Sequence, residues 1–198
     1  MLACKRLLDV VISLVLLIFC APLFLLLAAA VKISSEGPVL YRWRVVGRGG
    51  HPFLGYKFRS MFANADELKG DIEPLNEMNG PVFKLTNDPR VTPLGAWMRR
   101  HSLDELPQLY SVLKGDMSLV GPRPPLRTEY LRFNEFQKQK LAVKPGITCL
   151  WQVNGRNKVS DFDDWVSLDL EYIRRWSLSL DCWILFKTAR EVLSGSGK

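Results

Sequence analysis

Residues Leu7–Val31 read LLDVVISLVLLIFCAPLFLLLAAAV, and Asp9 and Ser13 are the only polar residues among them. The way this long apolar segment folds constrains the rest of the architecture. As one straight helix it would be roughly 37 Å long at about 1.5 Å per residue, enough to cross the ~30 Å apolar layer of a bilayer. Pro22 divides it into parts of 15 and 10 residues, and neither part is long enough to span. Proline removes a helical hydrogen bond and clashes with the preceding turn, so the sequence predicts a bend there.

The residues of this segment leave three interpretations open. Lys5 and Arg6 before an apolar run, with Ala28–Ala30 near its end, are typical of a cleaved signal peptide, although the run is longer than the usual apolar core of one. A kinked transmembrane helix would keep the two N-terminal cations in the cytoplasm and export the rest of the chain. A re-entrant hairpin would return both ends to the cytoplasmic side, which suits cations at both ends, Lys5, Arg6 and Lys32. Hydropathy alone does not separate the last two.

The rest of the chain has the composition of a folded protein. It has 198 residues, 47% of them apolar and 11% aromatic, which excludes intrinsic disorder. The net charge of +7 favours anionic partners, namely nucleic acid, an acidic membrane surface or phosphorylated substrates. The four cysteines show no C-x-x-C spacing, so neither a zinc cluster nor a disulfide scaffold is expected.

After Lys32 the pattern predicts a helix-dominated α+β fold. Two short aromatic and β-branched runs, Pro38–Val46 and Phe53–Met61, flank a glycine-rich connection and predict a β-hairpin. Tryptophans with arginines and lysines on the last two expected helices are typical of helices at a membrane interface. The expected helices are Phe62–Lys69, Leu94–Arg100, Leu106–Leu113, Thr128–Val143, Asp163–Trp176 and Leu180–Leu193.

The densest group of reactive side chains is RRHSLDELP, residues 99–107, where Asp104 and Glu105 follow two arginines. One structural alternative is a capping box, because Ser102 and Glu105 have the S-x-x-E spacing. In another, Asp104 caps the helix and Pro107 falls in its first turn. In both cases the carboxylates lie at a helix N-terminus, a position that also favours phosphate.

Several cations stand beside rigid turns, where a restrained backbone would prepare them to bind an anion. The alternative for each is a plain surface charge beside a turn. They are Lys57, Arg59, Arg90, Arg123, Lys144 and Arg156.

Five strings, in order along nearly the whole chain, resemble the bacterial sugar transferases, also called monotopic phosphoglycosyl transferases. They are YKFRSM (56–61), SLDELPQL (102–109), LKGDMSLVGPRP (113–124), KPGIT (144–148) and WQVNGR (151–156). The spacing of Asp169, Tyr172, Trp176 and Asp181 near the end also fits.

The resemblance implies transfer of a sugar 1-phosphate from a UDP-sugar to undecaprenyl phosphate, with release of UMP and with Mg²⁺ as cofactor. It implies a re-entrant segment broken at Pro22 in residues 1–32 and a catalytic domain in residues 33–198, on the cytoplasmic face of the bacterial inner membrane. Because nucleotide sugars are cytoplasmic, an exported body would meet no donor. A homodimer is left open, and no nucleic acid is expected as a partner.

The resemblance also assigns roles to residues of this chain. Asp104 would be the nucleophile that forms an aspartyl phosphosugar, and Glu105 would hold Mg²⁺. The expected phosphate-binding residues are Arg123, Lys57, Arg59 and Arg99. The expected nucleotide-binding or supporting residues are Lys144, Pro145, Gly146, Gln152, Arg156 and Asp169.

Three positions depart from the family pattern: Ala21 before the proline, Trp43 where glutamine is common, and Cys149 where glycine is common. The string GPVFK, residues 80–84, is similar to members that use plain hexose donors such as UDP-glucose or UDP-galactose. An alternative from another class is a non-catalytic basic membrane protein that binds acidic lipid or nucleic acid, for which Asp104 would be dispensable.

Overall fold

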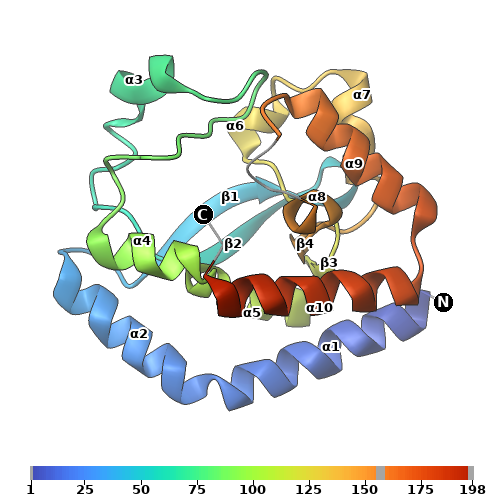
Figure 1. Cartoon of the computed structure of the whole chain (residues 1–198), viewed down its shortest axis with the longest axis horizontal. Helices are drawn as coiled ribbons and strands as arrows, with labels where there is room; N and C mark the ends of the chain where they lie inside the picture. The colour runs from blue at the N-terminus through green and yellow to red at the C-terminus, as the bar shows by residue number, and fades with distance from the viewer. Residues whose placement is uncertain (1, 155–158, 196–198) are drawn as a thin grey trace.

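The apolar N-terminal segment folds as two helices, α1 (Leu2–Phe19) and α2 (Ala21–Ser34), bent by 63° where they meet. Pro22 lies in the first turn of α2, where its missing N–H is tolerated, so the predicted break is confirmed. In the computed structural model, which describes residues 2–154 and 159–195, the pair forms an open V along one side of the molecule (Figure 1). Within these residues no single helix is long and apolar enough to cross a membrane, but the bent pair together meets the length and composition criteria.

Helix α1 turns its polar side chains towards the protein and its apolar side chains outward. Its buried residues are Asp9 and Ser13. Leucines, valines and a phenylalanine on the same helix stay exposed, among them Leu7, Val15 and Phe19. This arrangement is the reverse of a surface helix in water, where the apolar stripe faces the core.

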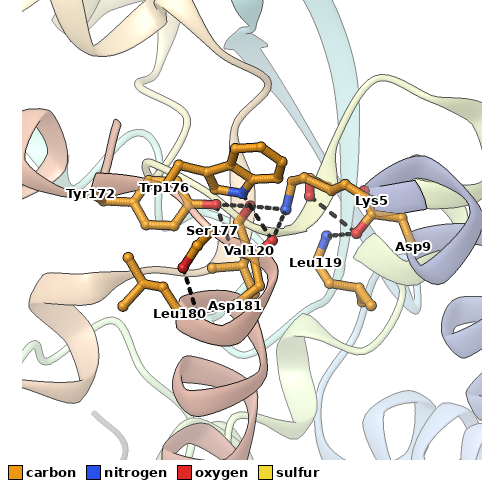
Figure 2. Close-up of polar contacts among 10 residues, drawn as sticks. Lys5, Asp9, Leu119, Val120, Tyr172, Trp176, Ser177, Leu180 and Asp181 are labelled. Atoms are coloured by element: carbon orange, nitrogen blue, oxygen red, sulfur yellow. Dashed lines mark hydrogen bonds and ion pairs between the residues drawn. The ribbon is translucent and has the colours of Figure 1, made fainter. Parts of the chain in front are cut away.

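Ion pairs and hydrogen bonds anchor α1 to the last helix and to a short strand (Figure 2). Lys5 Nζ lies 2.6 Å from the carboxylate of Asp181 and donates to the Val120 carbonyl at 3.1 Å. The phenol of Tyr172 donates to the same carboxylate at 2.8 Å. Asp9 accepts hydrogen bonds from the Ser118 hydroxyl and the Leu119 amide, at 3.1 and 3.0 Å.

The predicted hairpin is confirmed. Strands β1 (Leu40–Val46) and β2 (Pro52–Phe58) pair antiparallel, from Leu40 opposite Phe58 to Val46 opposite Pro52. The connecting glycine-rich turn, η1 (Arg48–Gly50), closes with a hydrogen bond from the Gly47 amide to the His51 carbonyl at 2.8 Å. The connection is therefore a turn between the two strands, as the hairpin prediction implies.

A second, parallel pair of strands was not predicted. Strands β3 (Ser118–Val120) and β4 (Gly146–Thr148) are only three residues each, too short for a hydrophobic pattern to show. The two backbones lie so close together that a Cβ on Gly146 would come 2.1 Å from the Gly121 amide nitrogen. A glycine is therefore required at this close approach.

Four expected helices are confirmed with small shifts of their ends, and two are wrong. Thr128–Val143 is not one helix, because Asn134 caps a new helix with its side chain and interrupts the first. Residues 62–68 form turns, and a helix begins only at Lys69. The remaining elements are α3 (Lys69–Ile72), η2 (Glu73–Leu75), α4 (Pro93–Arg100), η3 (Leu103–Glu105), α5 (Gln108–Lys114), α6 (Arg127–Tyr130), α7 (Glu135–Lys138), η4 (Gln139–Ala142), α8 (Leu150–Val153), α9 (Phe162–Arg175) and α10 (Leu178–Ser194).

The tryptophans of α9 and its C-terminal end serve packing and not a surface. Trp165 is buried beside Phe162 and Trp151, and Trp176 donates to Asp181 at 3.1 Å. Trp183 on α10 is exposed, with the Lys187 ammonium 5.5 Å from its ring centre. The last two expected helices carry Trp165, Trp176 and Trp183, and of these only Trp183 is exposed.

Helix α4 packs against Ser60, two residues after the end of strand β2. The Thr92 side chain caps the helix by accepting from the Gly95 amide at 2.9 Å. A Cβ on Gly95 would lie 1.9 Å from the Ser60 carbonyl oxygen. No other residue type fits this contact, so Gly95 sets how closely α4 approaches the hairpin.

We expect Gly95→Ala to lower the free energy of unfolding by about 3 kcal/mol or more, because the added methyl would overlap a backbone carbonyl that cannot rotate away. Gly70→Ala is the matched control: it lies in α3, and an added Cβ would contact nothing within 4 Å. That variant should be as stable as the wild type or up to about 1 kcal/mol more stable. Thermal unfolding in detergent compares the two, and equal stabilities would contradict the packing argument.

Candidate active site

The Asp104 carboxyl is set in place by a sharp turn between α4 and α5. Ser102 has a φ of +52°, and among the described residues it is the only non-glycine residue in the left-handed region. Such a residue costs free energy and clusters at functional sites. The Ser102 side chain makes no capping hydrogen bond, and α5 begins only at Gln108 after Pro107. The capping box and the Asp104 cap are therefore both wrong, and the two carboxylates are left for another role.

Asp104 is buried, with 6% of its surface exposed. Burial and then the adjacent Glu105 carboxylate raise its pKa to about 6, while the charges of Lys57 and Arg99 act in the opposite direction. At neutral pH the carboxyl is therefore mostly ionised and yet poorly solvated. A carboxylate in that state is both available and reactive as a nucleophile.

Lys57 comes from β2 and joins the hairpin to this turn. Its Nζ lies 2.6 Å from Glu105 Oε1 and 4.4 Å from the centre of the Trp43 ring. Trp43 is buried on the neighbouring strand and lies against Gly55, where a Cβ would come within 2.3 Å of its indole nitrogen. The aromatic ring and the carboxylate together fix the ammonium group.

Arg99 lies in the last turn of α4, and its Nε donates to the Ser60 hydroxyl at 2.9 Å. The structure thus brings together four of the predicted residues, from three parts of the chain: Asp104, Glu105, Lys57 and Arg99. Lys57 and Glu105, which form an ion pair, are 48 residues apart in the sequence, so they meet only in the folded chain.

Arg59 has a different task from the predicted one. Its guanidinium is buried and donates to backbone carbonyls at the end of α2, those of Val31, Ser35 and Glu36. Val31 lies in the last turn of α2, and Ser35 and Glu36 directly follow it, so the arginine caps the end of this helix. The structure therefore gives Arg59 a different role from the predicted one: its two terminal nitrogens hold the N-terminal helix pair to the end of the hairpin.

Arg123 and Asp169 lie in a second cluster. The Arg123 guanidinium lies 5.5 Å from the centre of the Trp165 ring and 3.7 Å from the Glu129 carboxylate. Asp169 forms an ion pair with Lys140 at 2.7 Å, and both side chains are almost fully buried. Burial raises the pKa of Asp169, and the charges of Lys140 and Arg123 oppose that rise. Asp169 therefore lies in the interior as the ion-pair partner of Lys140, and its role in supporting the site stays a prediction.

The other supporting residues lie around the parallel strands and α8. The Pro145 carbonyl accepts from the Ser118 amide at 2.8 Å, and Gly146 donates to the Pro122 carbonyl at 3.0 Å. These bonds hold the turn that carries Arg123. The Gln152 side chain is buried and accepts from the Cys149 thiol at 3.1 Å. Lys144 precedes β4, and its Nζ would lie 3.6 Å from a Cβ added to Gly115. Arg156 lies outside the described residues.

The contact of Ser60 with Arg99 and the contacts that hold α1 to the body were not predicted from the sequence. Ser60 was not singled out, because a serine after a strand has no distinctive pattern. The contacts of Lys5 and Asp9 with the body were also missed, although charged residues beside and within an apolar run are unusual enough to have pointed to them.

The acidic pair fits a magnesium ion that arrives with a diphosphate. Among residues 2–154 and 159–195, no group of three or more histidine, cysteine or acidic side chains could hold a metal. Mg²⁺ needs no such cluster, because it is commonly held by one or two carboxylates together with water and substrate phosphates. Asp104 and Glu105 supply two adjacent carboxylates of that kind.

Comparison with known proteins identifies the family. The sequence profile described as bacterial sugar transferase matches residues 1–195. The galactosyl transferase CpsE of Streptococcus agalactiae is 46% identical over 193 residues, 98% of this chain and 43% of that protein. The undecaprenyl-phosphate galactose phosphotransferase of Salmonella typhimurium is 46% identical over 197 residues, 98% of this chain and 41% of that protein.

A shorter relative is covered almost completely. The exopolysaccharide production protein ExoY of Rhizobium meliloti is 42% identical over 197 residues, 98% of this chain and 87% of that protein. The chain thus spans about two fifths of the length of the first two relatives and most of the third. It belongs to the bacterial sugar transferase family, as its motifs predicted.

The electrostatics of Asp104 predict a variant more stable than the wild type. An acid with a raised pKa binds its proton more tightly when folded, so its charge destabilises the fold above that pKa. We expect Asp104→Asn to raise the free energy of unfolding at pH 7 by up to about 3 kcal/mol, from a shift between 3.8 and about 6.

This gain in the free energy of unfolding should shrink as the pH falls from 6 to 4. Asp104 of the folded wild type then becomes protonated, and its charge no longer destabilises the fold. Thermal unfolding in detergent between pH 4 and 8 measures this. Asp71→Asn, on exposed α3, should show no such dependence. An Asp104→Asn variant less stable than the wild type at pH 7 would contradict the account.

Proposed function

We propose that this chain transfers a sugar 1-phosphate from a UDP-sugar to undecaprenyl phosphate and so starts the assembly of a surface polysaccharide. The observation that carries the proposal is the buried, largely ionised carboxyl of Asp104, with Glu105 beside it and the charges of Lys57 and Arg99 acting on it. Relatives named as undecaprenyl-phosphate galactose and glucose phosphotransferases support this reaction and favour a hexose donor.

The reaction proceeds in two displacements at phosphorus. An Asp104 carboxylate oxygen attacks the sugar-bearing phosphorus of the donor, and the bond to the UMP oxygen breaks, which leaves an aspartyl phosphosugar and free UMP. A phosphate oxygen of the lipid then attacks the same phosphorus, and the bond to Asp104 breaks. The product is a polyprenyl diphosphosugar, and the carboxylate is regenerated.

Both substrates are anionic, so the site must offset their repulsion. Lys57 and Arg99 place positive charge near the attacking carboxylate, and Arg123 is the proposed clamp for a phosphate in the second cluster. Glu105 is the residue that would hold Mg²⁺, which when bound neutralises diphosphate charge. The nucleotide would lie towards Lys144, Gln152 and Arg156.

The N-terminal pair is proposed to enter the membrane and return on the same side. Lys5 at the start of α1 is bound to Asp181, and the end of α2 is capped by Arg59, so both ends are tied to one body. The outward face of α1 is apolar, and Lys5 and Asp9 are bound by the protein. These contacts favour a re-entrant segment over a spanning helix, with the body on the cytoplasmic face of the inner membrane, where nucleotide sugars are found.

Release of UMP tests the reaction. In detergent with Mg²⁺, wild-type protein should release UMP from one of a panel of UDP-sugars, with sustained turnover only when undecaprenyl phosphate is present. Asp104→Asn should lower the rate at least about 10³-fold because it removes the nucleophile, and Asp71→Asn should leave the rate unchanged. Undiminished release by Asp104→Asn would overturn the covalent mechanism, and no release from any donor would favour a non-catalytic lipid-binding protein.

Labelling with a membrane-impermeant thiol reagent tests the topology. Two single-cysteine proteins carry either the native exposed Cys4 or Glu36→Cys, beyond α2, after the other accessible cysteines are replaced. Because a re-entrant segment returns to its side of entry, both should react in inside-out vesicles and neither in right-side-out vesicles. A spanning helix would place the two cysteines on opposite sides.

A further inference from the structure

The backbone that carries Arg123 is fixed on both sides. Arg123 stands between two prolines in the turn that follows strand β3, and each proline restricts its own φ angle. The Pro122 carbonyl accepts from the Gly146 amide at 3.0 Å, and the Pro125 carbonyl accepts from the Val46 amide at 3.0 Å. The point at which the arginine side chain leaves the backbone is therefore set, and only the direction of its guanidinium remains to be fixed.

Trp165 on α9 supplies a contact for that guanidinium. Its indole is buried, and its ring centre lies 5.5 Å from Arg123 Cζ. A guanidinium within about 6 Å of an aromatic ring centre is attracted by the electron-rich face of the ring. Trp165 is itself held by Trp151, whose ring centre is 3.9 Å away, and by Phe162 at 5.7 Å. The ring is therefore a fixed surface for the arginine.

This contact leaves the N–H groups of the guanidinium without a protein acceptor. Within residues 2–154 and 159–195, Arg123 donates no hydrogen bond. Its ion-pair partner, a carboxylate oxygen of Glu129, is 3.7 Å away and already accepts from the Leu126 amide at 2.8 Å. The buried Arg59 and Arg90 differ, because their terminal N–H groups are bound to a backbone carbonyl or a carboxylate. The donors of Arg123 remain available to a phosphate.

A second cation on the same ring has its own counter-charge. Lys140 Nζ lies 5.2 Å from the centre of the Trp165 ring and forms an ion pair with Asp169 at 2.7 Å. Both side chains of this pair are almost fully buried. The ring thus contacts one cation that is neutralised at hydrogen-bond distance and one, Arg123, that is not. An anionic ligand would be attracted to Arg123.

We propose that Trp165 is a positioning residue, whose ring holds the Arg123 guanidinium by a cation–π contact and leaves its N–H groups free to bind a phosphate of the donor. This inference rests on the proposed function, in which Arg123 is the phosphate clamp. Trp165 is buried and acts through the arginine. Phosphate binding then depends on the electron density of a ring on α9, far along the chain from the turn that carries Arg123.

The test replaces Trp165 alone with tryptophans that carry increasing numbers of ring fluorines. Fluorine withdraws electron density from the face of the ring and so weakens a cation–π contact, while the shape of the side chain hardly changes. The kcat/KM for the donor in UMP release should fall stepwise with the number of fluorines, about tenfold for the fully fluorinated ring. An unchanged kcat/KM across the series would overturn the proposal, because a role in packing alone gives that result.

Trp151 is the matched control for fluorination. It is buried like Trp165 and packs against it, and among the described residues no cation lies over its ring. The same fluorinated residues at this position should leave kcat/KM as in the wild type. An equal fall at both positions would show that the effect comes from packing and would overturn the assignment.

A double-variant cycle tests whether Trp165 acts through Arg123. Arg123→Ala removes the guanidinium, so fluorination of Trp165 in that background should lower kcat/KM no further. Lys140 keeps its contact with the ring in both backgrounds. A fall of the same size in both would therefore assign the effect to Lys140 and overturn the proposal.

A binding measurement that needs no activity separates this inference from the proposed function. In protein labelled with ¹⁵N at arginine, the Nε–Hε signal of Arg123 is assigned by its loss in Arg123→Lys. Pyrophosphate should shift this signal in the wild type, and the fully fluorinated Trp165 protein should need about tenfold more pyrophosphate for the same shift. If no donor yields UMP, the proposed reaction fails while this titration still decides the role of Trp165. No shift in the wild type, or equal affinities in the two proteins, overturns it.

Discussion

The burial of one carboxylate at a sharp turn is the constraint on which the site depends. Removing Asp104 from water disfavours its charge, and Glu105 beside it adds repulsion. The cations that oppose these effects come from two other elements, Lys57 from the hairpin and Arg99 from the preceding helix α4. Each is fixed by its own contacts, so the hairpin and α4 must be seated accurately for the site to exist. This explains why a backbone contact as close as that of Gly95 is needed.

The N-terminal helix pair exposes many apolar side chains, while Lys5 and Asp9 of α1 turn towards the protein. Lys5 and Asp9 find their partners on α10 and on the strand that precedes the Arg123 turn (Figure 2). The contacts that hold α1 therefore also hold β3. The apolar N-terminal pair is in this way built into the support of the turn that carries Arg123, the proposed phosphate clamp.

Much of this arrangement could be predicted, and particular residues show where prediction stopped. The bend at Pro22 and the hairpin follow from local chemistry, so they were predicted correctly. Arg59 was predicted as a phosphate ligand because it stands two residues after Lys57, beside a rigid turn. Strand β2 ends at Phe58, so the alternation of the strand does not extend to Arg59, and the two side chains bind different partners. The break before Asn134 was missed because the apolar residues of that stretch looked continuous.

The sequence by itself determined the apolar segment and its break, the helix-dominated fold with a hairpin, and the motifs that define the family. These depend on the order of neighbouring residues, which proline geometry, alternation and spacing express directly. Only the tertiary structure decided which cations meet Asp104, that Arg59 caps a helix, and that Ser60 holds Arg99. The hydrogen bonds of Lys57, Arg59 and Ser60 join residues 23 to 48 positions apart, and their geometry depends on how closely two backbones approach, which no local pattern encodes.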